Sequence, residues 1–454
     1  MKIIIIGTGE VGYHIAHRLS LENKDVVVID TDDEAVRRVS ENIDVQAICG
    51  SGSSPSILEE AGIRETEILL AVTDSDETNL TACLMTDLLS SSTKKLARIR
   101  NADFDAFHEV FKGSAPRIDT IINPEIEVVR SIEQYMSVPG AGDVGEFENG
   151  RVKFVGIRLQ PDTPMVGLRL SEISEAIGRP SPLIAAILRS EEMIIPRGKD
   201  RLLEGDMVYF ISETDNLMEI LKLFDKQSEP VRRVLIVGGG RIGLRLAVRL
   251  EEGSIYTKII EKDENRCSLL AEKLDQTVVL HGDGTDQVIL EQEGIRDMDV
   301  VVTLTVEEQT NVLASLLAKQ LGARKTITRI NSFRYLPLMS TIGIEQVVSP
   351  RLSAINTILR HIRRGKVLSA VSLKGEQAEI IEAVAMETSE IVGKPLKEIS
   401  FPKGVLVTII IRDKRITIPS GDSVIHPGDR VIIFGSRQAV PQIEKILAVK
   451  LEYF

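Results

Sequence analysis

Aromatic residues are scarce in this chain of 454 residues, which contains no Trp, 6 Tyr and 11 Phe. Proteins that bind single-stranded nucleic acids stack the bases on aromatic rings, so this scarcity disfavours such a function. The formal net charge of -12 points the same way, because an acidic surface repels phosphate backbones. We therefore expect no nucleic-acid partner.

Cysteine is equally rare, with only Cys49, Cys83 and Cys267 in the whole chain and no CxxC pair. This number and spacing provide neither a disulfide framework nor a zinc site, and they are typical of a reducing compartment. No cluster of His, Cys and Asp has the spacing of metal ligands either. We therefore expect no metal site.

Long apolar runs are missing as well. A helix that crosses a bilayer needs roughly 20 largely apolar residues, whereas stretches such as 68–72 and 183–188 are much shorter. The segment MKIIIIGTGE reaches a glycine too early to provide the hydrophobic region of a secretory signal. These features predict a cytoplasmic or peripheral protein rather than an integral membrane protein.

The chain contains a long internal repeat. Residues 2–12, KIIIIGTGEVG, align with residues 233–243, RVLIVGGGRIG, and in both copies a helix of amphipathic spacing follows. CGSGSS at 49–54 matches HGDGTD at 281–286, and ARIRN at 97–101 matches TRINS at 328–332. A weaker repeat joins 165–173 to 391–399 and 196–210 to 419–434, where alternating Ile and Val are interrupted by Gly-Asp turns.

This pattern predicts an α/β fold with four domains. The strand–helix repeats predict two Rossmann-like, doubly wound parallel-sheet domains, and the tails predict a small α+β domain after each of them. The predicted limits are 1–137 and 138–228 for the first copy, and 231–366 and 367–454 for the second.

Each large domain opens with a glycine turn suited to a dinucleotide. Glycines at 7, 9 and 12 match glycines at 238, 240 and 243. In such a turn the first glycine permits the tight bend, the second lets the backbone approach a pyrophosphate, and the third lets the helix pack closely on the strand. The helix that follows directs free N–H groups at the phosphates. The alternative is a tight strand–helix turn beside an empty crevice.

An acidic residue ends the second strand of each copy. Asp30 lies 18 residues after Gly12, and Glu261 lies 18 residues after Gly243. A carboxylate there can accept hydrogen bonds from the adenosine ribose and repels the 2′-phosphate of NADP. This predicts NAD(H), although ATP or ADP also contains the adenosine diphosphate group and stays open at either site.

Further candidates follow the later strands, whose carboxyl ends border the crevice of a parallel sheet. Threonine, aspartate and serine side chains could border the base or ribose, and an arginine could reach a phosphate. Helix capping for Ser51 and Asp283, and surface ion pairs for the arginines, are the alternatives. The candidates are Ser51, Thr73, Asp74 and Arg98 in the first copy, and Asp283, Thr305 and Arg329 in the second.

No residue set suited to catalysis is evident. The six histidines are His14, His17, His108, His281, His361 and His426, and none of them has a histidine at the matching position of the other copy. We therefore expect no catalytic residue and no enzyme. The competing hypothesis is an NAD-dependent oxidoreductase with residues 140–228 as its substrate domain.

Taken together, GTGEVG with Asp30, AVTDSDETNL, ARIRN, GGGRIG with Glu261 and the two Gly-Asp-bearing tails resemble the TrkA family. These are cytosolic regulatory subunits of bacterial Trk-type potassium uptake, built from tandem RCK (KTN) modules. The resemblance implies RCK N-terminal and C-terminal domains in each copy. It also implies a homo-oligomeric ring on the inner face of the cell membrane, held there by a potassium-transporting membrane subunit. A regulator of a different cation channel or antiporter is the remaining alternative.

The resemblance also implies which residues hold NAD(H). In the first copy they are Gly7, Thr8, Gly9, Glu10, Val11, Gly12, Asp30, Thr73, Asp74 and Arg98. In the second they are Gly238, Gly239, Gly240, Arg241, Ile242, Gly243, Glu261, Thr305 and Arg329. The second copy departs from the pattern, because Val306 replaces Asp74 and Lys262 follows Glu261. We therefore expect the first site to be the main sensor.

Overall fold

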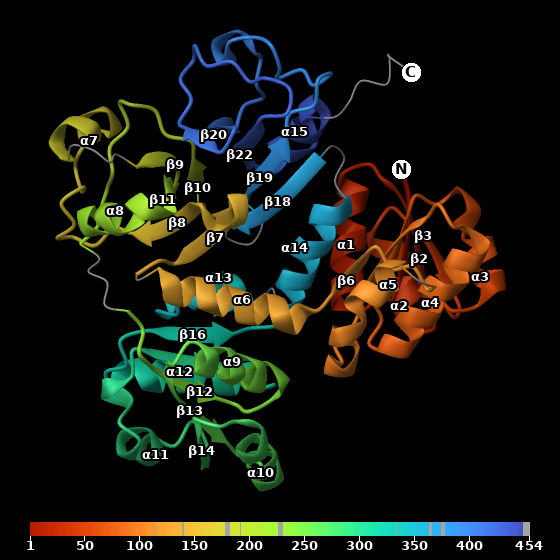
Figure 1. Ribbon diagram of the computed structural model, residues 1–454, viewed down its shortest axis with the longest axis horizontal. Coiled ribbons are helices and arrows are strands. Elements are labelled where there is room, and N and C mark those ends of the chain that lie inside the picture. The colour runs from red at the N-terminus through yellow and green to blue at the C-terminus, as the bar shows by residue number, and fades with distance from the viewer. Residues whose placement is uncertain are drawn as a thin grey trace. The chain divides into compact units, whose positions relative to one another are not determined.

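The computed structural model describes residues 1–113, 115–138, 140–177, 182–190, 192–225, 230–332, 334–362, 366–373 and 377–447 (Figure 1). The chain forms two compact units. One consists of Met1–Val128 with Ser349–Ile362, and the other of Val129–Val348 with Arg363–Phe454.

The first unit is built on a parallel six-stranded sheet with the strand order β3-β2-β1-β4-β5-β6. The four isoleucines of the central strand β1 are at most 1% exposed, as expected of a strand covered by helices on both faces. The strands are β1 (Lys2–Ile6), β2 (Asp25–Asp30), β3 (Gln46–Cys49), β4 (Ile68–Ala71), β5 (Lys94–Arg98) and β6 (Thr120–Ile122). The connecting helices are α1 (Glu10–Leu21), α2 (Asp33–Asn42), α3 (Pro55–Glu60), η1 (Ile63–Glu65), α4 (Asp76–Leu89), η2 (Ala102–Phe107) and α5 (His108–Gly113).

The second unit contains a parallel sheet of the same order, β14-β13-β12-β15-β16-β17. The strands are β12 (Arg233–Val237), β13 (Tyr256–Glu261), β14 (Val278–His281), β15 (Val300–Thr303), β16 (Thr326–Arg329) and β17 (Gln346–Val348). The helices are α9 (Arg241–Glu252), α10 (Glu264–Lys273), α11 (Gln287–Gln292), η5 (Ile295–Asp297), α12 (Glu308–Gln320) and α13 (Leu336–Thr341). The predicted pair of doubly wound parallel sheets is thus confirmed.

Two antiparallel five-stranded sheets, β10-β9-β11-β8-β7 and β18-β19-β22-β20-β21, complete the second unit. The first contains β7 (Asp143–Phe147), β8 (Val152–Arg158), β9 (Leu183–Arg189), β10 (Glu192–Ile194) and β11 (Met207–Glu213), with η3 (Glu148–Gly150), α7 (Leu170–Ile177), η4 (Thr214–Asn216) and α8 (Leu217–Leu223). The second contains β18 (Lys366–Leu373), β19 (Ala378–Val384), β20 (Val405–Arg412), β21 (Arg415–Thr417) and β22 (Arg430–Ser436), with η6 (Leu396–Glu398), η7 (Arg437–Ala439) and α15 (Val440–Leu447). The predicted small α+β domains are confirmed.

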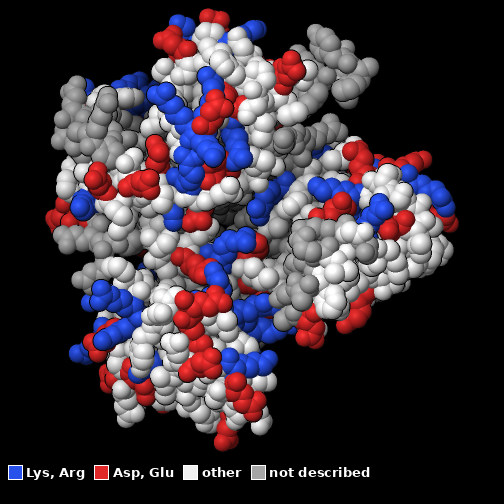
Figure 2. Space-filling view, in the orientation of Figure 1, with Lys and Arg blue, Asp and Glu red and all other residues white. Residues whose placement is uncertain are grey.

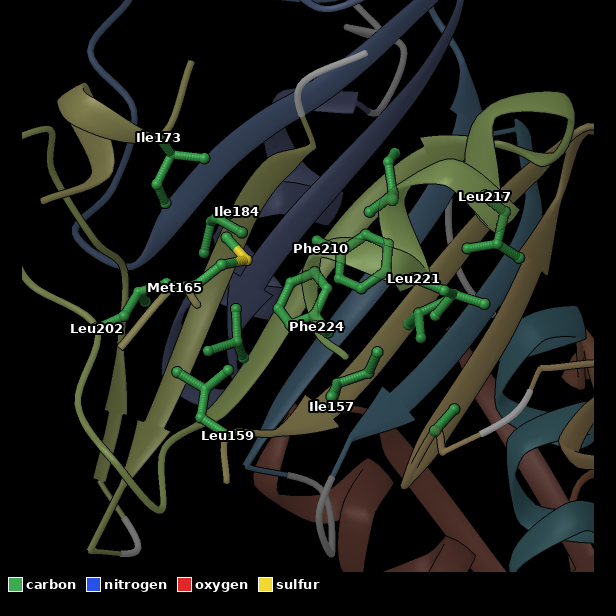
Figure 3. Close-up of a cluster of buried hydrophobic side chains, with 14 of the residues drawn as sticks. Ile157, Leu159, Met165, Ile173, Ile184, Leu202, Phe210, Leu217, Leu221 and Phe224 are labelled. Atoms are coloured by element: carbon green, nitrogen blue, oxygen red, sulfur yellow. The ribbon is translucent and has the colours of Figure 1, made fainter. Parts of the chain in front are cut away.

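Alternation along the strands of these two sheets divides their side chains between two cores. On one face of the first small sheet, Phe210 packs with α8 and stacks on Phe224 at a ring distance of 5.0 Å (Figure 3). On the other face, Phe154 and Tyr209 share a core with Ile380 and Phe434 of the second small sheet. The two small sheets therefore pack face to face.

The last helix of each large repeat is exchanged between the two halves of the chain. Helix α14 (Pro350–Ile362) follows β17 in the sequence, yet it packs against α1 of the first copy. Lys94 Nζ, at the start of β5, donates to the backbone carbonyl of His361 in α14 over 3.0 Å. Helix α6 (Pro124–Ser137) shows the reciprocal contact, because Lys325 Nζ donates to the carbonyl of Tyr135. Lys325 is the repeat equivalent of Lys94. The sequence limits at 137 and 366 did not predict this exchange.

Candidate functional site

The first glycine turn joins β1 to α1. Gly7 has a φ of +100°, which L side chains rarely adopt, and its N–H donates to Ile29 O over 2.8 Å. A Cβ on Gly12 would lie 1.8 Å from Gly7 O, so only glycine fits there. A Cβ on Gly9 would meet nothing within 4 Å. The turn is therefore tight at its first and third glycines and open at the middle one, where a phosphate would approach.

The second turn repeats this geometry between β12 and α9. Gly238 has a φ of +103°, and a Cβ on Gly243 would lie 2.2 Å from Gly238 O. Gly240 again faces open space. A Cβ on Gly239 would lie 2.3 Å from Leu270 Cδ1, so a side chain at this position, which holds Thr8 in the first copy, would require Leu270 to move.

The residues that begin the helices contribute differently to the two turns. The side chains of Val11 and Ile242 are buried in the core, so only their backbone N–H groups can serve a ligand. Glu10 is half exposed and forms an ion pair of 3.5 Å with Arg351, the second residue of α14. Arg241 is exposed at the equivalent position of α9. The helix after the first turn thus begins with a carboxylate, and the helix after the second turn begins with a guanidinium.

Asp30 ends β2 directly beside the first turn. Its carboxylate accepts hydrogen bonds from Thr8 N at 2.5 Å and Thr8 Oγ1 at 2.7 Å, and from Asp32 N at 3.0 Å. Burial raises the pKa of this carboxyl, but the hydrogen bonds from Thr8 and from the backbone together lower it by a larger amount. The pKa of Asp30 therefore lies below the usual value. Asp30 is therefore an anion at neutral pH, at the position predicted for the ribose contact.

Glu261 takes the same place at the end of β13. One carboxylate oxygen accepts from Gly239 N at 2.7 Å, and the other accepts from the backbone N–H groups of Lys262 at 2.7 Å and Asp263 at 2.9 Å. Both acids therefore tie the glycine turn to the second strand. Because a carboxylate has about four lone-pair sites, this role leaves capacity for ribose hydroxyls.

A buried asparagine fixes the end of β4. Thr73 donates from its N–H and its Oγ1 to Asn79 Oδ1, at 3.0 and 2.8 Å, and Asn79 Nδ2 donates back to Thr73 O and to Arg98 O at 3.1 and 2.8 Å. Asn311 makes the same four bonds to Thr305 and Arg329 O. Sequence reasoning did not identify these asparagines as site residues, although a matched Asn six residues after each Thr was a usable signal.

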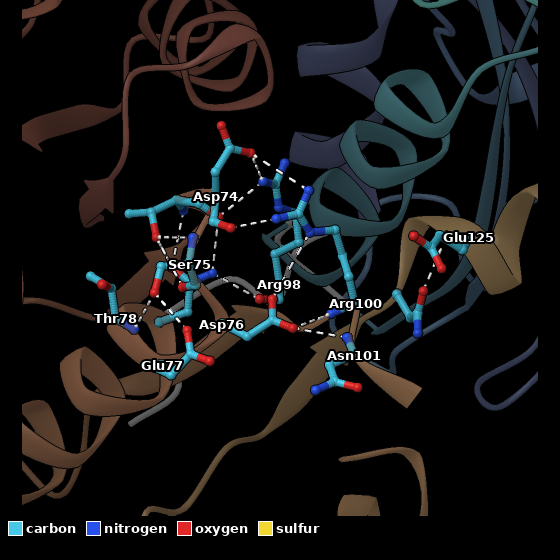
Figure 4. A network of polar contacts seen from close by, with 12 residues as sticks. Asp74, Ser75, Asp76, Glu77, Thr78, Arg98, Arg100, Asn101 and Glu125 are labelled. Atoms are coloured by element: carbon cyan, nitrogen blue, oxygen red, sulfur yellow. Dashed lines mark hydrogen bonds and ion pairs between the residues drawn. The ribbon is translucent and has the colours of Figure 1, made fainter. Parts of the chain in front are cut away.

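Two arginines and two aspartates form a polar network beyond β4 and β5 (Figure 4). Arg98 donates to Thr73 O over 2.9 Å and to the carboxylate of Asp74. Arg100 donates to the carbonyl of Asp74, and Asp76 accepts from the backbone N–H groups of Arg100 and Asn101 at 3.0 and 2.8 Å. The sequence predicted Arg98 and Asp74 as candidates and missed Arg100.

Burial affects the charge of Arg98. It lowers the pKa of the guanidinium, the neighbouring Arg100 lowers it further, and the hydrogen bond with Asp74 acts in the opposite direction. The cationic form of Arg98 is therefore supported by an anion at this position, which Asp74 supplies.

The second copy lacks most of this network. Val306 stands in place of Asp74 and is 80% exposed, and Asn331 stands in place of Arg100. Arg329 donates to Leu304 O and to Asn331 Oδ1, both at 3.4 Å. Glu308 takes over the role of Asp76 by accepting from Asn331 N at 3.1 Å. The two sites thus share a scaffold and differ in charged residues.

Ser51 and Asp283 make local contacts after the third strand of each copy. Ser51 Oγ lies 2.9 Å from Ser53 Oγ, and Asp283 accepts from Thr285 N at 2.9 Å and pairs with Lys262 at 3.2 Å. Hydrogen bonds from Thr285 lower the pKa of the Asp283 carboxyl. Neither residue is a helix cap, since α3 follows Ser54 and α11 follows Asp286.

Among the residues that the structure describes, no group of three or more His, Cys, Asp or Glu side chains is arranged to hold a metal ion. None of the helices in this part of the chain combines the length and apolar character needed to span a bilayer. On the face shown in Figure 2, Lys and Arg are interspersed with Asp and Glu, so no single-sign surface covers it.

Comparison with known proteins matches both halves of the chain to the same families. The TrkA-N domain family matches residues 3–124 and 234–350, and the TrkA-C domain family matches residues 154–225 and 380–448. These matches fall on the two parallel sheets and the two antiparallel sheets, respectively.

Among solved structures, the RCK domain of GsuK is similar at a TM-score of 0.59 with 17% identity, covering 98% of this chain and 94% of that chain. The GsuK channel bound to NAD gives a TM-score of 0.60 with 17% identity, covering 98% of this chain and 78% of that chain. At this identity the likeness is one of fold.

Curated relatives are similar over their whole length. The Trk system potassium uptake protein TrkA homolog 1 of Methanosarcina mazei is 37% identical over 452 residues, which is 98% of this chain and 99% of the relative. The Trk system potassium uptake protein TrkA of Halomonas elongata is 36% identical over 458 residues, covering all of both chains. With both domain types matched twice in the same order, the chain belongs to the TrkA family.

Proposed function

We propose that this chain is a nucleotide-sensing regulatory subunit that gates a Trk-type potassium transporter through a ligand-dependent change of conformation. The observation that carries the proposal is the duplicated glycine turn, tight at two glycines and open at the middle one, with an acid beside it. The relatives at 36–37% identity are potassium uptake proteins by name, which supports the Trk system as the one that is regulated.

The proposed ligand of the first site is NAD(H), with ATP or ADP as the other candidates. Its adenosine ribose would lie at Asp30, and its phosphates at the N–H groups that begin α1. Thr73 and Asp74, on the loop after β4, and Arg98, which donates to both of them, are the further contacts proposed for this ligand. GsuK, which shares the fold, has been solved with NAD bound, and this supports a nucleotide in a crevice of this kind.

In the second site, Glu261 and the turn from Gly238 to Gly243 would bind the same adenosine diphosphate group. Thr305, Asp283 and Arg329 are the further contacts proposed for it. Lys262, which pairs with Asp283, and Val306 change the local charge, so we propose that this site differs from the first in its nucleotide preference.

A ligand can move such a protein only as far as its affinities for two conformations differ. A coupling of about 1–3 kcal/mol is typical of allosteric regulation and would give a graded response. In the first unit the route is short, because α1 begins at the glycine turn and packs against α14 from the second copy. We propose that occupancy of the first turn changes the position of α14.

The proposed partner is a membrane potassium-transporting subunit, with the chain acting as a homo-oligomeric ring on the cytoplasmic face of the membrane and not as an enzyme. Co-purification with a membrane protein tests this assignment. A Trk-type subunit in the complex supports it, whereas a different cation channel or antiporter would replace it. NADH oxidation that depends on an added substrate would favour the alternative of an oxidoreductase.

The decisive experiment places an anion at the open glycine of each turn. Gly9 has backbone angles that any residue adopts, φ -58° and ψ -177°, and a Cβ there has no neighbour within 4 Å, so Gly9→Asp is expected to fold. The added carboxylate occupies the phosphate position and repels it. Binding of NADH and ATP to the full chain, measured by calorimetry, is expected to weaken by at least about tenfold at the first site.

Gly9→Ala is the matched control, since it adds the same Cβ without the charge; it is expected to weaken binding less than Gly9→Asp, and the difference between the two variants measures the effect of the charge. Gly240→Asp and Gly240→Ala repeat the comparison in the second copy, where Gly240 also faces open space. Potassium flux through the reconstituted complex is the functional measurement. Unchanged nucleotide binding and unchanged flux in Gly9→Asp would refute the proposal.

A further inference from the structure

The first crevice contains a carboxylate held between two guanidinium groups. Asp74 is on the loop after β4, and its carboxylate bonds to Arg98 from β5 and lies 3.8 Å from Arg100 Nη1. The Asp74 side chain is 90% exposed, whereas that of Arg98 is only 10% exposed. Figure 4 shows the Asp74 carboxylate directed at both arginines. The Asp74 carboxylate thus faces solvent, whereas the Arg98 guanidinium is buried and held in place.

The strand order determines what would meet this network. β1 lies between β2 and β4, so a nucleotide held at Asp30 and at the glycine turn extends toward β4 and β5. The two strands adjoin at the turn, since a Cβ on Gly7 would lie 3.0 Å from the backbone of Thr73. The group beyond the second phosphate would therefore extend toward Asp74 and Arg98. In NAD(H) this group is an uncharged ribose, and in ATP it is a further phosphate.

We propose that Asp74 is an internal counter-anion of the first site, which a terminal phosphate must replace on Arg98 and Arg100, so that Asp74 sets the preference between ATP and NAD(H). This rests on the proposed function, in that the first turn is taken to bind a nucleotide. The nucleotides that could occupy the first site differ in charge beyond the second phosphate. The extra phosphate of ATP competes with Asp74 for the arginines, whereas the nicotinamide ribose of NAD(H) does not.

The energetics favour displacement of Asp74 rather than of the arginines. An exposed carboxylate regains its hydration when it swings away, so its release costs little. Arg98 is buried and stays in place, held by its bond to Thr73 O. Charge-assisted bonds from two guanidiniums to a phosphate are among the stronger polar contacts in proteins. A phosphate would therefore enter an arginine pair that is already positioned.

The second copy provides a comparison within the chain. Val306 offers no carboxylate at the position of Asp74, and Asn331 replaces Arg100. A terminal phosphate at the second site would meet Arg329 with Val306 in place of the Asp74 carboxylate. The two sites of one chain are therefore expected to rank ATP and NADH differently.

The test uses the full chain with Gly240→Asp as background, so that binding is measured at the first site. Asp74→Asn keeps the size of the side chain and removes its charge. Calorimetry with ATP, ADP and NADH is expected to show ATP bound about tenfold more tightly and NADH changed by less than about twofold. Glu77→Gln is the matched control, because it removes a charge three residues away that bonds to Ser75 and contacts neither arginine.

Equal gains for ATP in Asp74→Asn and Glu77→Gln would overturn the proposal, because they would reflect the general field of the acidic surface. Weaker ATP binding in Asp74→Asn would overturn it as well, since Asp74 would then be a ligand contact. Arg100→Ala is a second variant, expected to weaken ATP by about tenfold and to leave NADH unchanged. If the background protein binds none of the three nucleotides, the proposed function fails instead.

Discussion

Asn79 organises the first crevice without facing a ligand, and its replacement by alanine is the sharpest test of how the site is built. The side chain is fully buried and is bonded to both Thr73 and Arg98. In Asn79→Ala, Thr73 O keeps its bond from Arg98 and Thr73 Oγ1 keeps its bond to Ser75 O. Thr73 N and Arg98 O lose the partner that Asn79 gave them.

The expected cost follows from these two groups. Leaving a buried donor or acceptor without a partner costs about 1–3 kcal/mol. Solvent that enters the space left by the amide recovers part of this, so we expect local stability at Thr73–Asn79 to fall by about 2–3 kcal/mol. Since 1.4 kcal/mol is a factor of ten, local opening should become roughly 30- to 150-fold more frequent.

Hydrogen exchange measured by mass spectrometry reports this opening directly. Peptides that cover residues 73–79 and 98–101 are expected to exchange faster in Asn79→Ala, and ATP and NADH are both expected to bind more weakly at the first site. Residues 305–311, where Asn311 makes the same bonds, provide the control within the same molecule. Unchanged exchange at 73–79, or equal acceleration at 305–311, would show that the reasoning about Asn79 is wrong.

Three further outcomes follow from other parts of the structure. Gly12→Ala is expected to prevent folding of the first unit, because the added Cβ at residue 12 would lie 1.8 Å from Gly7 O, whereas Gly9→Ala meets no neighbour and is expected to fold. Circular dichroism spectra of the two variants would show the difference. Phe224→Ala should lower the free energy of unfolding by about 3–4 kcal/mol, measured by denaturant titration, since its buried ring would leave a cavity. Burial lowers the pKa of Lys325 to about 8, so the folded chain binds fewer protons than the unfolded chain above that pH. Stability relative to Lys325→Met is therefore expected to rise by up to about 2 kcal/mol from pH 8 to 9.5 in pH-resolved unfolding.

The sequence was sufficient for the sheets because their signals are local. A buried apolar run followed by a glycine turn and an amphipathic helix occurs twice, and both occurrences form the centre of a parallel sheet. The exchange of α6 and α14 was not predictable in this way. Both helices have the same amphipathic pattern wherever they pack, and the contacts of Lys94 and Lys325 with distant carbonyls have no sequence signature.

For the candidate site, too, residues with a local sequence signal were predicted and residues that act through long-range contacts were not. Asp30 and Glu261 were predicted from their spacing after the glycine turn, and the structure brings each carboxylate to within hydrogen-bond distance of that turn. Arg100 was missed because its role depends on the conformation of the loop after β5, which brings it to the carbonyl of Asp74. Asn79 was missed as well, because the bonds of its side chain to two separate loops cannot be identified from its sequence position alone. Contacts between loops that are far apart in the sequence could therefore not be predicted from the sequence and became visible only in the structure.

The exchange of helices gives the two sites unequal consequences. The proposed ligand of the first turn would contact the start of α1, where Glu10 pairs with Arg351 of α14. A ligand that displaced Glu10 would therefore act on α14, a helix encoded by the second copy. Because Arg241 replaces Glu10 in the second copy, an anionic ligand there meets a cation at the same position. Phosphate at the first turn adds like charge beside Glu10, whereas phosphate at the second turn lies beside the opposite charge of Arg241, so the same nucleotide is expected to act on the starts of the two helices with opposite electrostatic signs.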